Sequence, residues 1–78
     1  MARLLLLGPA REAAGTKHDV IDAVNVGDVL DVAVARYGRV FADVLATSQV
    51  WLNGEATDRS RAVTDHDEIA VLPPVSGG

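Results

Sequence analysis

The pattern of hydrophobic and polar positions predicts several short strands. Residues 2–7 are almost continuously apolar and are followed by Gly8 and Pro9. This is typical of a buried strand that ends there, because proline cannot donate to a sheet ladder. Residues 17–24 mix apolar and polar positions and predict a second strand, paired with the first as a hairpin. Further strands are predicted at residues 49–52, 62–63 and 68–72.

One segment has clear helical periodicity. Asn25 is a predicted helix N-cap, and Asp28 follows it by three residues, as in a capping box. Apolar positions then recur at three- and four-residue intervals, and Gly38 is expected to supply a left-handed cap. The pattern therefore predicts a helix over residues 26–37, with a short second helical turn over residues 40–45.

The remaining segments are predicted to be loops and turns. Residues 9–16 are expected to be a connecting loop, and residues 64–67 a turn in which His66 has a positive φ. Asn53 and Gly54 together are the strongest short signal for a hairpin turn.

The order strand, strand, helix, strand, short strand, strand indicates an α+β domain, with one main helix packed across one face of a mixed sheet. Residues 4–7 and 69–72 are apolar at consecutive positions, so both faces of the predicted sheet carry hydrophobic side chains. One helix covers only one face. The other face is either closed by sheet curvature and loops or covered by a partner, and the sequence leaves both possibilities open.

Length and charge narrow the classes of function. A chain of 78 residues fits a single small domain. Its net charge of −4 and scattered arginines argue against nucleic-acid binding and favour a protein partner with a basic docking surface. No apolar run approaches the roughly 20 residues of a membrane span, and no signal segment is recognisable. We expect a cytoplasmic protein without membrane contact.

Side chains suited to catalysis or metal binding are sparse. The chain has no cysteine, which excludes disulfides, thiolate metal sites and a cysteine nucleophile. His18 and His66 are isolated, and Asp65, Asp67 and Glu68 lack the spacing of a calcium loop. We therefore expect no metal site, no stably bound cofactor and no autonomous enzyme activity.

The last six residues have an unusual composition: Pro73, Pro74, Val75, Ser76, Gly77 and Gly78. The two prolines fix φ and remove two N–H donors, so the chain is expected to leave the sheet and extend by at most about 20 Å. Glycine has no β-carbon, so the terminal carboxylate can pass along a very narrow channel. We expect a domain over residues 1–72 and a tail over residues 73–78, the alternative being an inert frayed end.

Residues 64–78 resemble the C-terminus of the small subunits of molybdopterin synthase, a family of ubiquitin-like sulfur carriers. Residues 11–16 and 52–55 support this resemblance, which spans essentially the whole chain. Its most specific part is the Pro-Pro-Val-Ser-Gly-Gly ending, because the diglycine alone is common to sulfur carriers and ubiquitin-like modifiers. The resemblance implies a β-grasp fold, in agreement with the predicted order of elements.

The resemblance also implies a site and a set of partners. In this family, an adenylyltransferase similar to ubiquitin-activating enzymes uses Mg-ATP to adenylate the terminal carboxylate, here that of Gly78. A sulfur donor protein then displaces AMP and leaves a thiocarboxylate. The large subunit of molybdopterin synthase, where catalysis is expected, transfers this sulfur to cyclic pyranopterin monophosphate. The residues implied to contact partners are Val71, Leu72, Pro73, Pro74, Val75, Ser76 and Gly77.

Other functions remain open. The same tail chemistry serves sulfur carriers for thiamine, cysteine or tRNA thiolation, and the large partner that co-purifies would distinguish them. A ubiquitin-like modifier would instead form isopeptide bonds through Gly78. A β-grasp interaction module with an inert tail is the third alternative.

Overall fold

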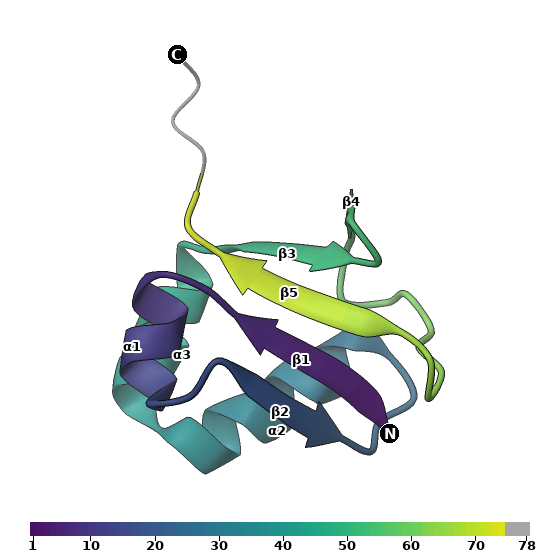
Figure 1. The fold of residues 1–78 in the computed structure, drawn as a ribbon, viewed down its shortest axis with the longest axis horizontal. Helices are drawn as coiled ribbons and strands as arrows, with labels where there is room; N and C mark the ends of the chain where they lie inside the picture. Colours follow the sequence, from purple (N-terminus) through teal and green to yellow (C-terminus); the bar gives the residue numbers. More distant parts are fainter. Residues whose placement is uncertain (75–78) are drawn as a thin grey trace.

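The computed structural model describes residues 1–74, and residues 75–78 lie outside the described part. The described residues form one mixed sheet with strand order β2-β1-β5-β3-β4 (Figure 1). The strands are β1 (Ala2–Leu6), β2 (His18–Ile21), β3 (Gln49–Leu52), β4 (Glu55–Ala56) and β5 (Glu68–Leu72). The helices are α1 (Pro9–Ala14), α2 (Val26–Tyr37) and α3 (Arg39–Ala46).

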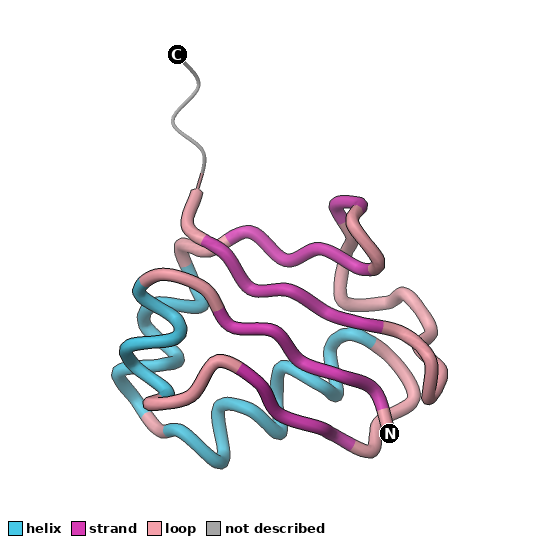
Figure 2. Tube along the Cα trace, viewed as in Figure 1, coloured by secondary structure: helices cyan, strands magenta, loops and turns pink. Residues whose placement is uncertain are grey.

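The first and last strands lie side by side at the centre of the sheet. β1 runs parallel to β5, with Leu4 opposite Ile69, and antiparallel to β2. β3 runs antiparallel to both β5 and β4. The helices form one layer on one side of this sheet, with α2 crossing behind it and α1 packed beside α3 (Figures 1 and 2). This is the β-grasp, ubiquitin-like fold, as predicted.

Alternating side chains of the two central strands form the core. Their inward-facing residues are Leu4, Leu6, Ile69 and Val71, each at most 1% exposed. They face Val29 of α2 and Phe41 of α3, which are also buried. Burying one such aliphatic or aromatic side chain stabilises the fold by about 1.5–3 kcal/mol. No helix within residues 1–74 is long and apolar enough to cross a membrane.

The main helix begins as the sequence predicts. The Asn25 side chain accepts a hydrogen bond of 2.8 Å from the backbone N–H of Asp28, and α2 spans Val26–Tyr37. Gly38 has φ 93° and ψ −166°, which is not the left-handed helical conformation that we predicted. With this ψ the chain leaves α2 and enters α3 directly, with Gly38 as the N-cap. The segment that we predicted as a short helical turn is a full helix, Arg39–Ala46.

The predicted loop over residues 9–16 is wrong, because the segment contains α1. Pro9 occupies the first turn of this helix, where its missing N–H costs nothing. Gly15 closes the helix in the left-handed conformation, donating its N–H to the Arg11 carbonyl at 2.9 Å. Buried Ala10 anchors the helix to the core.

Two further expectations about turns are corrected. The short strand is Glu55–Ala56, not residues 62–63, because the turn at Asn53 and Gly54 folds it directly back onto β3. Both turn residues have positive φ, 52° and 85°, as this hairpin turn requires. Ala62 makes only an isolated bridge to Asn25. Among the non-glycine residues described, Asn53 alone has a positive φ, so the expectation for His66 is wrong.

Candidate functional site

The candidate site is the point at which the chain leaves the sheet after β5. Leu72, the last strand residue, is paired with Gln49 of β3. On the other side of β5, the N–H of Leu7 donates to the Val71 carbonyl at 3.0 Å. Pro73 and Pro74 follow and are exposed. Since proline has no N–H to donate, strand pairing does not continue through them.

The predicted partner-contact residues separate into different environments. The Val71 side chain is 0% exposed and packs in the core, so it is not available to a partner in this fold. Leu72 points the other way, because successive strand residues face opposite sides of a sheet, and it is half-buried. The predictions for Val75, Ser76, Gly77 and Gly78 lie outside the described residues.

The sheet face opposite the helices, which we call the outer face, is apolar near the tail. It carries Leu5, Ala70, Leu72 and Trp51, all half-buried. The register brings them together, with Ala70 lying between Leu5 and Trp51. No helix or strand of residues 1–74 covers this face (Figure 1). The alternatives of closure by sheet curvature and loops or coverage by a partner therefore both concern a face without a helix over it in the described chain.

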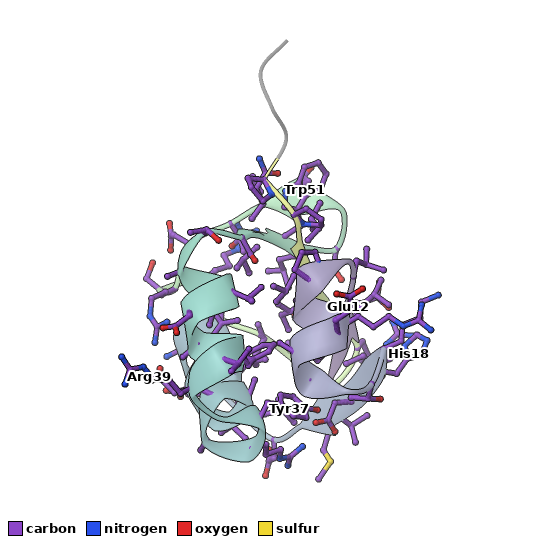
Figure 3. All side chains as sticks on the ribbon, turned by 90° about the vertical axis from the view of Figure 1, so that its left-hand side faces the viewer. Glu12, His18, Tyr37, Arg39 and Trp51 are labelled. Atoms are coloured by element: carbon purple, nitrogen blue, oxygen red, sulfur yellow. The ribbon has the colours of Figure 1, made fainter. Side chains whose placement is uncertain are left out.

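Trp51 is a part of this face that the sequence interpretation did not single out. It lies at the end of the molecule beyond the helices (Figure 3). Its partner Ala70 is two residues before the end of β5. Its indole N–H donates to the Gln49 side chain at 3.1 Å. It is the only tryptophan of the chain. Its position across from Ala70 follows from strand register, which no local sequence signal encodes.

The other end of the outer face is charged. A shallow, open hollow of about 480 Å³ is lined by Arg3, His18, Asp19, Val20 and Glu68. Arg3 is flanked by Val20 and Glu68 in the strand register. Within residues 1–74, no three histidine, aspartate or glutamate side chains gather as metal ligands. The hollow therefore lacks the convergent ligands of a metal centre.

Asp19 and two α2 side chains protect the edge of β2. The Asp19 carboxylate accepts hydrogen bonds from the Tyr37 hydroxyl and, at 2.9 Å, from the Arg36 guanidinium. Asp19 also accepts from the backbone N–H of Val20, and Arg36 donates to the Val20 carbonyl. Both outward backbone groups of Val20 are thus satisfied by side chains, which disfavours pairing of this edge with another strand.

The same network shifts two pKa values. Partial burial raises the pKa of Asp19, but the hydrogen bonds from Tyr37 and Arg36 outweigh it, so that the net pKa is lowered. Burial and the Asp19 carboxylate together raise the pKa of Tyr37 to about 12. The Asp19 contribution to stability is therefore present above its unfolded pKa and is lost as the pH falls through its folded pKa.

A titration of Tyr37 tests this network. Tyr37 is the only tyrosine, so phenolate absorbance reports on it alone. We expect a midpoint near 12 in the folded protein and near 10 in denaturant. Because the folded pKa is raised, the contribution of Tyr37 to stability is full below pH 10 and is lost as the pH approaches 12. Asp19→Asn should lower the midpoint, and a folded wild type titrating near 10 would contradict the network.

The root of the tail contains a second residue that the sequence interpretation missed. Gly8, between β1 and α1, has φ 59° and ψ −132°. A β-carbon built there would lie 2.7 Å from Cγ of Pro73. The backbone of Gly8 thus lies directly against the first proline after β5. The only sequence signal was the Gly8-Pro9 pair, which we interpreted solely as a strand end.

Comparison with known families and structures agrees with this architecture. The model of the ThiS family matches residues 4–78. Small archaeal modifier protein 1 of Haloferax volcanii is 37% identical over 83 residues, covering 94% of this chain and 95% of that protein. Its crystal structure has a TM-score of 0.83 to this fold, with 31% identity, and covers 99% of this chain and 98% of its own.

Two further similarities involve molybdopterin proteins. The molybdopterin synthase sulfur carrier subunit of Drosophila erecta is 30% identical over 81 residues, covering 96% of this chain and 88% of that protein. A chain in the complex of subunits 1 and 2 of the Helicobacter pylori molybdopterin-converting factor has a TM-score of 0.73. At 22% identity over 99% of this chain and 97% of that one, the Helicobacter pylori likeness concerns the fold alone.

Proposed function

The chain belongs to the ThiS family of ubiquitin-like sulfur carriers, and we propose that it serves molybdopterin synthesis as the small subunit of molybdopterin synthase. The observation that carries this proposal is the end of β5. There, the strand gives way to two exposed prolines beside an uncovered apolar face, and the sequence continues to a diglycine. Such a body can be held by a partner while the tail reaches into that partner's active site.

The proposed chemistry takes place at the carboxylate of Gly78. On an activating adenylyltransferase, a carboxylate oxygen attacks the α-phosphate of Mg-ATP, pyrophosphate leaves, and an acyl-adenylate forms. The outer sulfur of a donor protein's persulfide then attacks the carbonyl carbon and AMP leaves. A thiol reductant cleaves the resulting acyl disulfide, which leaves a thiocarboxylate, whereas free sulfide displaces AMP and gives the thiocarboxylate directly. Mg-ATP belongs to the activating partner, and the acid–base groups belong to the partners as well. In the proposed reaction this chain contributes the sulfur-bearing terminus and the surface that presents it.

The second half of the proposed cycle uses the large subunit of molybdopterin synthase. The thiocarboxylated tail enters that active site and transfers its sulfur to cyclic pyranopterin monophosphate. In this step the sulfur bonds to the substrate while it is still attached to the acyl carbon of Gly78, which forms a thioester. Water then hydrolyses the bond between that carbon and the sulfur, so the sulfur stays on the substrate and Gly78 returns to a carboxylate. Each dithiolene needs two sulfur atoms and hence two charged carriers.

The outer face is the proposed docking surface for these partners. Leu5, Ala70, Leu72 and Trp51 form an apolar area next to the root of the tail. Partner interfaces commonly combine such an apolar centre with a charged rim, and here Arg3 and Glu68 lie farther along the same face. The net charge of −4 favours a basic docking surface on the partner.

Intact-mass spectrometry tests the proposed function. The purified chain is incubated with the activating adenylyltransferase, Mg-ATP and sulfide. We expect an ATP-dependent species heavier by the difference between one sulfur and one oxygen atom, located at Gly78 by fragmentation. With the large subunit and cyclic pyranopterin monophosphate, this species should return to the carboxylate while dithiolene product appears. Absence of the heavier species would refute the sulfur-carrier role. A heavier species that is not consumed would refute the molybdopterin assignment.

A second candidate function is protein modification. The similarity to small archaeal modifier protein 1, at 37% identity, favours it. In this case the activated Gly78 would form an isopeptide bond with a lysine of another protein. Arg61 is the last lysine or arginine in the chain, so trypsin would leave residues 62–78 attached to the target lysine. Detecting that branched peptide in cells would support the modifier role, and its absence under conditions that yield thiocarboxylate would exclude it.

A further inference from the structure

Gly8 and Pro73 touch at the place where the tail begins. From this contact we infer that Gly8 is a positioning residue for sulfur transfer. Because Gly8 has no β-carbon, the Pro73 ring fits against its backbone, and we call this space the seat. The seat sets the direction of Pro73 and hence of the start of the tail. The inference rests on the proposed sulfur-carrier function. It assigns a task to a residue at the β1–α1 junction, far from the tail in sequence.

The backbone of Gly8 is held in a conformation that suits glycine. Its φ of 59° and ψ of −132° lie in a region that L-residues rarely occupy. Neighbouring bonds fix this geometry on both sides. The Gly8 carbonyl accepts from the N–H of Glu12 at 3.1 Å, within the first turn of α1. The N–H of Leu7 donates to the Val71 carbonyl at 3.0 Å, which ties the junction to β5.

The space above Gly8 is filled by the Pro73 ring. A β-carbon at Gly8 would lie 2.7 Å from Cγ and 3.3 Å from Cδ of that ring. The shorter distance is below any normal carbon–carbon contact, so a side chain at residue 8 must push the ring away. The ring is rigid and its φ is fixed, so the displacement is passed to the backbone that follows.

A small change of direction at the root becomes large at the end of the tail. In the proposed reaction the six tail residues reach at most about 20 Å into the partner, so a tilt of about 10° at Pro73 would move the far end of a chain bound in that extended form by about 3 Å. A misplacement of about 1 Å at reacting atoms can already cost about a hundredfold in rate. The seat at Gly8 therefore aims the terminus, while the outer face supplies the docking contacts.

Gly15 offers a matched control at the other end of α1. It also has a positive φ, 76°, but no atom lies within 4 Å of the position that a β-carbon would take. Gly15→Ala therefore imposes backbone strain without a collision. We expect both Gly8→Ala and Gly15→Ala to lower the Tm, but only Gly8→Ala to slow the chemistry.

The test measures Tm and the steady-state rate of ATP-dependent thiocarboxylation for each full-length variant. Gly8→Ala is expected to lower kcat by about tenfold to a hundredfold, with the KM for the carrier within about twofold, because the docking face is unchanged. Gly15→Ala should keep the wild-type kcat. An unchanged kcat in Gly8→Ala, or equal losses in both variants, would overturn the inference.

Pro73→Ala completes a double-mutant cycle and does not strain Gly8. Removing the ring frees the tail root, so kcat should fall by about threefold or more at an unchanged Tm. The double variant Gly8→Ala/Pro73→Ala should have the same kcat as Pro73→Ala, because the collision with the ring is gone. If the reductions in kcat of the two single variants instead multiplied in the double variant, the seat would be refuted. If Gly8→Ala does not fold, Pro73→Ala decides alone, and an unchanged kcat overturns the inference. A wild type that is never thiocarboxylated would instead refute the proposed function.

Discussion

Deletion of Gly78 should abolish thiocarboxylation and leave thermal unfolding unchanged. The shortened chain still ends in a carboxylate, that of Gly77, so the functional group itself is not lost. What is lost is one residue of reach, about 3.5 Å. Reacting atoms must approach to about 3–3.5 Å, so a terminus held back by one residue stays outside attack distance. The Tm should hold because the core is formed by residues between Ala2 and Val71.

Two variants separate the causes of this loss, and intact-mass spectrometry with the activating partner, Mg-ATP and sulfide reads out both. Gly78→Ala keeps the length of the tail and adds a β-carbon. A strong loss of thiocarboxylation in this variant would show that the partner's channel is too narrow for a β-carbon. Val40→Ala, at an exposed position of α3, leaves the whole tail unchanged and should be thiocarboxylated at nearly the wild-type rate. Full thiocarboxylation of the Gly78 deletion, at the new terminus Gly77, would contradict the requirement for this length of tail.

The elements with strong local signals could be predicted from the sequence. The Asn25 cap and the helical periodicity after it gave the bounds of α2, and the hydrogen bond from Asp28 confirms the cap. β3 and β5 also have their predicted bounds, because each is a short apolar run next to a turn. In these segments the local preference and the tertiary packing agree.

The elements that were mispredicted depend on contacts that the sequence does not display. α1 has six residues, too few for a stable isolated helix, and it is held by the burial of Ala10 against the core. Its Pro9 and Gly15 are typical start and stop signals, but a loop explained them equally well. β4 has two residues and exists because the turn at residues 53–54 folds it onto β3.

The candidate site was predictable in part. The prolines marked the end of β5, and the structure agrees on that position. The last four residues of β5 are all apolar, however, so their sequence alone does not decide which of them face the helices. Register decides it, burying Val71 and directing Leu72 to the outer face. The contact of Gly8 with Pro73 joins two distant segments, so only the folded structure reveals it.

Leu72→Glu should weaken the complex with the large subunit far more than it weakens the fold. Leu72 is half-buried on the outer face at the root of the tail, and not in the core. In the free protein the new carboxylate can stay hydrated, so a loss of at most about 1 kcal/mol in unfolding free energy is expected. In a complex that covers this face, the carboxylate would be buried without a partner charge. We expect a loss of about 2 kcal/mol or more in binding, roughly thirtyfold in Kd by isothermal titration calorimetry.

Val40→Glu is the matched control for the charge. Val40 is 66% exposed on α3, in the helical layer, and this substitution changes the net charge by the same amount. Both variants carry one more negative charge than the wild type. If docking depended only on long-range attraction to a basic partner, both would therefore bind at least as well as the wild type. Burial of the outer face instead predicts weak binding for Leu72→Glu and normal binding for Val40→Glu. Equal Kd values for the two variants, or a large loss of Tm in Leu72→Glu with unchanged binding, would remove the outer face as the docking surface.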